Sequence, residues 1–179
     1  MDKNELKAIL EKHSLYLRED PEGERAELEH ADLAGSDLHG ADLQDSNLRN
    51  AKMRGSNLRN ADLSYSDLAG ADLRGADLTS ASLNAADLRF ADMNGANLRF
   101  ANLYDADLSN ANLSGADLRE SNLKHATMYR SNLSGANMFG ADLYNADMHK
   151  ANIAGTNFKS VPDPVRAPNG FDPEEQGQA

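Results

Sequence analysis

The side chains that could do chemistry in this chain are five histidines, several serines and many aspartates. Histidine can ligate a metal ion or transfer a proton, but no carboxylate stands at metal-ligand spacing from His13, His30, His39, His125 or His149. The serines alternate with alanine at one position of a recurring pattern, which favours core spacers over nucleophiles. Cysteine is absent, as is any calcium-binding or phosphate-binding glycine loop. We therefore expect no catalytic residue, no metal and no cofactor, and predict that the protein is not an enzyme.

An internal repeat positions these residues. From Ala26 to Ser160, 27 consecutive blocks of five residues repeat one pattern without insertion or deletion. The pattern is a small residue, then Asp or Asn in most blocks, then a large apolar residue, then two variable positions. A spacing of five would scatter the apolar residues around a helix, or send alternate ones to opposite faces of a strand. All of them can be buried on one side only if the chain turns a corner in every block, so the pattern predicts a β-solenoid.

Glycine supplies a second, slower period. It ends a block every 20 residues, at Gly35, Gly55, Gly75, Gly95, Gly115, Gly135 and Gly155. Twenty residues are four blocks, which predicts four sides per coil and nearly seven coils. We expect this one corner to need a residue without Cβ, either for a positive φ or for a close backbone approach.

The motif Ala-(Asp/Asn)-Leu-X-X, as in Ala31-Asp32-Leu33, resembles the pentapeptide-repeat family over about three quarters of the chain. The resemblance implies an all-β fold, a right-handed quadrilateral β-helix with four pentapeptides per coil. It also implies that the central apolar residue and the leading Ala or Ser point inward. The other three positions of each block then point outward.

The chain divides into three regions. We predict an N-terminal capping helix and loop over residues 1–25, the β-helix over 26–160, and a Pro-rich acidic tail, disordered for the most part, over 161–179. The helix is expected from residue 2 to about 19, because Asp2 and Glu5 have capping-box spacing and Pro21 follows. It would cover the first coil, where a solenoid exposes apolar core and unpaired strand edges.

The last coil carries larger core residues, among them Ile153 and Phe158. Two alternatives remain open for that end. It is covered by apolar residues that follow it, namely Val161, Val165 or Phe171, or it pairs with a second copy. A closed two-fold homodimer through the C-terminal coil would remove the exposed edge.

The composition limits the partners. The net charge of −11 argues against direct binding to nucleic acid. No apolar run suggests a signal peptide or a bilayer span, so we expect a cytoplasmic protein without a membrane partner.

Writing the sequence in columns 20 residues apart gives two candidate binding surfaces. An aromatic and arginine edge has the composition of protein interfaces; its residues are Arg99, Phe100, Tyr104, Arg119, Phe139 and Tyr144. An acidic stripe stacks like charges in one column; its residues are Asp67, Asp87 and Asp107. The stripe is either a negative surface for a basic partner or drift within a motif that tolerates Asp.

We expect a non-catalytic scaffold that binds an unidentified protein partner through its flat faces. The alternative is DNA mimicry, the best-known activity of the family that the chain resembles, with DNA gyrase or another DNA-binding protein as partner and quinolone protection as outcome. The repeats hold 18 acids against 12 bases, a net charge of −6. Duplex DNA carries one negative charge per roughly 1.7 Å, so a rod of about 32 Å would need about 19 negative charges to match it. This deficit weakens the mimicry hypothesis.

Overall fold

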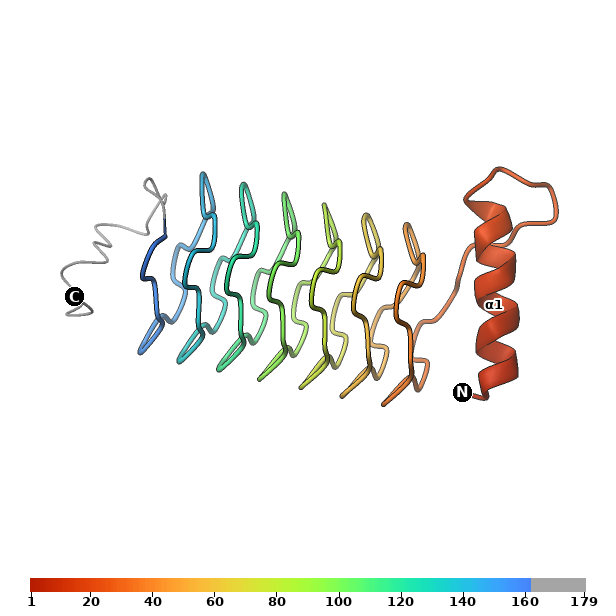
Figure 1. Ribbon diagram of the computed structural model, residues 1–179, viewed down its shortest axis with the longest axis horizontal. Coiled ribbons are helices and arrows are strands. Elements are labelled where there is room, and N and C mark those ends of the chain that lie inside the picture. The colour runs from red at the N-terminus through yellow and green to blue at the C-terminus, as the bar shows by residue number, and fades with distance from the viewer. Residues whose placement is uncertain (162–179) are drawn as a thin grey trace.

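A computed structural model describes residues 1–161. Figure 1 shows one helix lying across the end of a stack of similar coils. The helix, α1, spans Lys3–Tyr16. The coils contain no extended strands among the described residues; 23 isolated parallel β-bridges hold them together, from Glu27↔Asn47 to Asn137↔Asn157.

Each bridge joins residues 20 positions apart, so one coil is 20 residues, or four blocks. We number the coils from the N-terminus, with coil 1 at residues 26–45. Backbone hydrogen bonds link each block to both neighbouring coils. The N–H of Asn47 donates to the carbonyl of Ala26 at 3.0 Å, and the N–H of Leu48 donates to the carbonyl of Asp67 at 2.7 Å. The central apolar residues from Leu28 to Met148 are at most 2% exposed and form one continuous column inside the coils.

A turn closes every block. The N–H of each leading residue donates to the carbonyl of the preceding core residue, as from Ala31 to Leu28 at 3.0 Å. The residue before the next block has φ between 52° and 71° at all 27 block ends, as in a type II turn. Ten of these residues are glycine and 17 are not. The left-handed conformation is therefore a property of all four corners, not of one.

The expectation that one corner specifically needs glycine is therefore wrong. A Cβ on Gly35 or Gly95 would meet nothing within 4 Å, which excludes a close approach there. Positive φ remains as a reason for glycine, yet Phe90 and Phe100 adopt the same φ at two other corners. The result of the glycine column is a corner that carries no side chains.

The Asp or Asn of each block caps the backbone locally. Its Oδ1 accepts the N–H of the residue two positions later, which no backbone carbonyl reaches. All 23 blocks with Asp or Asn at this position make the bond, at 2.9–3.4 Å; examples are Asp32 to Ala34 and Asn157 to Lys159. This Asx-type turn explains why the motif favours a short side chain with an acceptor oxygen.

The α1 helix covers the first coil. Leu6 and His13 are buried against it, and the Nδ1 atom of His13 accepts the N–H of Ala26 at 3.1 Å. The hydroxyl of Tyr16 donates to Asp45 at 2.6 Å. The capping box is realised in part: Asp2 is the N-cap, and its carboxylate accepts the N–H of Asn4.

The helix ends at Tyr16, three residues earlier than predicted. Glu19 has a φ of 59°, and the N–H of Asp20 donates to the carbonyl of Leu15 in the manner of a Schellman motif. Gly23 then packs its backbone directly on the helix, because a Cβ there would lie 2.1 Å from the nitrogen of Tyr16. This glycine, unlike the glycine column, is required by close approach.

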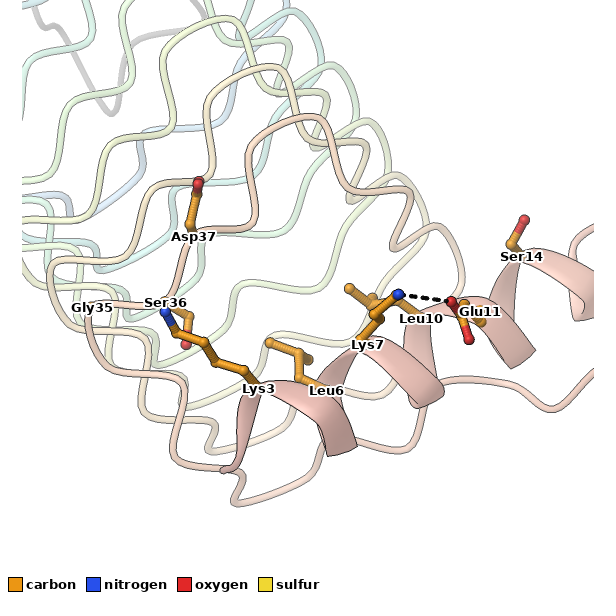
Figure 2. Close-up of a pocket in the computed structure, with 9 residues that line it drawn as sticks. All are labelled: Lys3, Leu6, Lys7, Leu10, Glu11, Ser14, Gly35, Ser36 and Asp37. Atoms are coloured by element: carbon orange, nitrogen blue, oxygen red, sulfur yellow. Dashed lines mark ion pairs between the residues drawn. The ribbon is translucent and has the colours of Figure 1, made fainter.

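The helix leaves part of coil 1 uncovered. An open groove of about 540 Å³ runs between α1 and coil 1. Figure 2 shows Leu6 and Leu10 on its apolar side and Lys3 reaching toward Ser36.

Residues 162–179 lie outside the described part of the chain. Most of the predicted tail lies there, as do Val165 and Phe171.

Candidate partner-binding surface

Every fourth block lies on the same side of the stack, which gives four faces. We name them by their first block: face 1 begins with residues 26–30, face 2 with 31–35, face 3 with 36–40 and face 4 with 41–45. Their charges differ. Face 1 carries six acids and four bases, face 2 three of each, face 3 four of each, and face 4 five acids and one base. The net charge of −6 on the repeats therefore divides into −2 on face 1 and −4 on face 4.

The acidic stripe lies on face 1, and local bonds occupy its carboxylates. Asp67, Asp87 and Asp107 each accept a backbone N–H at 2.9–3.1 Å, from residues 69, 89 and 109. They also have cationic neighbours. Arg49 lies 3.1 Å from Asp67, and Arg89 lies 2.5 Å from Asp87 and 3.8 Å from Asp107. Two arginines thus offset most of the charge of three carboxylates.

The pairing affects proton binding. The hydrogen bond from Arg89 holds the pKa of Asp87 below its usual value, against an opposing effect of burial. At neutral pH the Asp87 carboxylate is therefore an anion, and Arg89 already occupies its oxygens.

The structure divides the aromatic and arginine edge between two neighbouring corners. Its residues lie in three successive coils, 4 to 6, at the two corners that bound face 4. Arg99, Phe100, Arg119 and Phe139 lie in the turns between faces 3 and 4, whereas Tyr104 and Tyr144 lie in the turns between faces 4 and 1. The four aromatic side chains are 39–51% exposed. They are four of the seven exposed large apolar side chains among residues 1–161.

The two arginines of this edge are held in place. Arg119 donates from Nε and a terminal nitrogen to both oxygens of Asp117, and these bonds lower the pKa of Asp117. The guanidinium carbon of Arg99 lies 5.2 Å from the ring centre of Phe100. Its Nε is buried and has no hydrogen-bond partner among the described residues. The edge therefore carries two arginines that are oriented by neighbouring side chains.

The structure adds histidines to the aromatic surfaces, although the sequence analysis assigned none of them to a surface. His125 lies between Tyr104 and Tyr144, with ring centres 5.3 and 5.9 Å away and edge-to-face geometry. On face 1, Tyr129 stacks on His149 at 6.0 Å. The sequence does contain an indication of this arrangement. Tyr104, Lys124 and Tyr144 form one column at a spacing of 20 residues, and His125 directly follows Lys124.

The geometry offers little for catalysis. No group of three or more His, Cys, Asp or Glu side chains among residues 1–161 could hold a metal ion. Burial holds the pKa of His13 below its usual value, but its Nδ1 is already occupied by the Ala26 N–H.

Comparison with known families decides the identity of the repeats. A family model described as pentapeptide repeats matches eight copies within residues 24–159. The chain belongs to the pentapeptide-repeat family. A search of curated proteins gave no match.

Solved pentapeptide-repeat structures resemble the chain. HetL of Nostoc sp. strain PCC 7120, involved in heterocyst differentiation regulation, is 25% identical over 83% of this chain and 91% of its own, with a TM-score of 0.55. A pentapeptide-repeat protein of the Arabidopsis thaliana thylakoid lumen is 38% identical over 55% of this chain and 68% of its own, with a TM-score of 0.54. QnrB1, a plasmid-mediated fluoroquinolone resistance protein, is 20% identical over 80% and 79%, with a TM-score of 0.40.

Proposed function

We propose that this pentapeptide-repeat protein is a non-catalytic scaffold that binds a protein partner through face 4 and its two corners in coils 4 to 6. The proposal takes the coils to form the right-handed quadrilateral β-helix of the family. The observation that carries it is the pair of exposed aromatic clusters that bound this face, Phe100 and Phe139 at the corner with face 3 and Tyr104 and Tyr144 at the corner with face 1, on a frame whose core column is closed to solvent.

The energetics of interfaces favour this surface. Binding hot spots are rich in aromatic residues and arginine, and rigid side chains lose little conformational entropy when they bind. Arg119 is fixed by Asp117, and Arg99 lies against Phe100. A partner would therefore meet oriented cations and rings whose positions are already set.

Affinity capture with matched variants tests the proposal. The immobilised full chain is compared with a Phe100→Ala/Tyr144→Ala variant and with Phe90→Ala, which removes a still more exposed ring from the corner between faces 1 and 2. We expect a partner that binds the wild type and Phe90→Ala but not the double variant, with affinities then measured by calorimetry on the purified pair. Equal binding to all three chains would refute this surface.

A second candidate function is DNA mimicry toward DNA gyrase or another DNA-binding protein. The net charge of −11 favours it. The pairing of Asp67 and Asp87 with arginines weighs against it, because it reduces the negative field of the stripe. A gyrase supercoiling assay with and without a quinolone tests it; inhibition or protection at micromolar protein would place this function first.

The remaining partner assignments are proposals as well. We propose a cytoplasmic protein with neither a membrane nor a nucleic acid as direct partner. Within residues 1–161 no helix has the length and apolarity to cross a bilayer.

We also propose a homodimer through the C-terminal coil. Ile153, Phe158 and Val161 are only partly buried there, whereas core residues of the inner coils are closed to solvent. A monomeric mass by light scattering at micromolar concentration would refute the dimer.

A further inference from the structure

We propose that face 4 and its corner with face 1 bind an arginine- or lysine-rich segment of the partner protein. This inference rests on the proposed scaffold function and specifies the charge of the partner. Three features of the surface within residues 1–161 carry it. The surface is negatively charged, its exposed tyrosine rings have no cation beside them, and one of its aspartates has no hydrogen-bond or ion-pair partner.

Face 4 is the acidic face of the repeats. Its single base among the 12 of the array is Lys124, which Asp142 holds at 2.9 Å. The corner that face 4 shares with face 1 has neither Lys nor Arg; its residues are Asp45, Tyr65, Ala85, Asp105, His125 and Asn145. Opposite charge raises both the rate and the specificity of association, so a cationic segment fits this face and an anionic one does not.

The tyrosines of face 4 have no cation of their own. Two other rings do have cations beside them: Arg99 lies 5.2 Å from Phe100, and Arg130 and Lys150 lie 5.2 and 5.7 Å from Tyr129. Among residues 1–161, no such contact involves Tyr65, Tyr104 or Tyr144, which are 62%, 40% and 46% exposed. His125 packs between Tyr104 and Tyr144, but the exposed parts of these rings can still attract guanidinium and ammonium groups.

Asp105 is the carboxylate that completes the surface. Most aspartates of the array accept a backbone N–H two residues on, but Asp105 ends its block and makes no side-chain hydrogen bond or ion pair within the described residues. It follows Tyr104 directly and precedes His125 by one coil. An arginine of the partner could therefore pair with Asp105 while its guanidinium lies on the ring of Tyr104.

The dimensions fit a short peptide. Face 4 has six blocks, and adjacent coils lie about 4.8 Å apart, so the face is about 24 Å long. An extended chain rises about 3.3 Å per residue. About seven residues of a partner would cover the face, with a positive side chain available to each pair of coils.

A peptide-binding assay tests the inference with defined probes. Fluorescein-labelled octapeptides of alternating Gly and Arg, and of alternating Gly and Glu, are titrated with the full chain, and binding is followed by fluorescence anisotropy. We expect the arginine peptide to bind and the glutamate peptide not to bind. Raising the salt from low to about 0.3 M should weaken binding several-fold, because exposed charges are screened.

Matched variants separate this surface from general attraction to an acidic protein. Tyr104→Ala/Tyr144→Ala should weaken the arginine peptide about tenfold, since two cation–π contacts are lost. Asp105→Asn should weaken it about threefold, as for one exposed ion pair. Phe90→Ala and Glu29→Gln remove an exposed ring and an exposed acid from other parts of the array and should change nothing.

The outcomes distinguish this inference from the proposed function. No binding of the arginine peptide, or an equal loss with the two control variants, would overturn it. A captured partner that requires Phe100 but binds through a neutral or acidic segment would also overturn it while leaving the scaffold function intact. Specific binding of the arginine peptide, with no partner that depends on Phe100, would instead refute the proposed function and support the cationic site alone.

Discussion

Replacing Asp107 distinguishes a structural carboxylate from a functional one. Its Oδ1 accepts the N–H of Ser109 at 2.9 Å, whereas its nearest cation, Arg89, is 3.8 Å away. In Asp107→Ala the Ser109 N–H loses its partner in a half-buried position. A typical intramolecular hydrogen bond contributes about 1 kcal/mol. In Asp107→Asn the amide oxygen can accept the same bond, so the free energy of unfolding should change little.

The assay is urea unfolding followed by circular dichroism, with thermal melts as a second readout. For a chain of this size, a loss of about 1 kcal/mol lowers the Tm by roughly 2–4 °C. Asp105→Asn is the control for loss of a surface charge, since Asp105 makes no side-chain bond among the described residues. If Asp107→Asn destabilises as much as Asp107→Ala, or if neither changes stability, the capping account of the motif is wrong.

Three further predictions concern the corners and the cap. Gly95→Ala should cost about 1 kcal/mol of unfolding free energy although its Cβ meets nothing within 4 Å, because φ is 64°; an unchanged urea midpoint would contradict this. Gly23→Ala should detach α1 from coil 1, since its Cβ would lie 2.1 Å from the Tyr16 nitrogen; hydrogen exchange should then show loss of protection in Lys3–Tyr16 but not in the inner coils. Burial lowers the pKa of His13, only partly opposed by Asp42 and Asp45, so the folded state binds its proton less readily than the unfolded state. Stability should therefore be full above pH about 6.5 and fall as the pH drops below it, and His13→Gln should abolish this part of the pH dependence.

The period of the sequence predicts the coil because it leaves one geometric solution. A core residue every five positions can be buried on one side only by a turn in each block, and the 20-residue period of glycine then predicts the coil of four blocks that the bridges show. The glycine column misled the interpretation of the corners. Positive φ occurs at every block end. The Asx turns and the backbone hydrogen bonds between coils hold even Phe90 and Phe100 in this conformation.

The surface was harder to predict, because its contacts depend on side-chain direction. Arg89 could pair with Asp87 in its own block or with Asp107 in the next coil, and the column map cannot choose between them. The position of His125 between two tyrosines likewise required the corner geometry. The end of α1 was missed because a Schellman motif with Glu19 in place of glycine has no clear sequence signal.

The measurement that tests the scaffold function most directly compares both surfaces against one partner, gyrase included. Affinity for the captured partner is measured for the wild type, for Phe100→Ala/Tyr144→Ala, and for a variant with Asn at residues 67, 87 and 107, which keeps the local caps. We predict that the aromatic variant loses binding and that the asparagine variant keeps it. If only the asparagine variant loses affinity for the partner, the account is contradicted. The acidic stripe would then be the better-supported surface, and DNA mimicry the better-supported function.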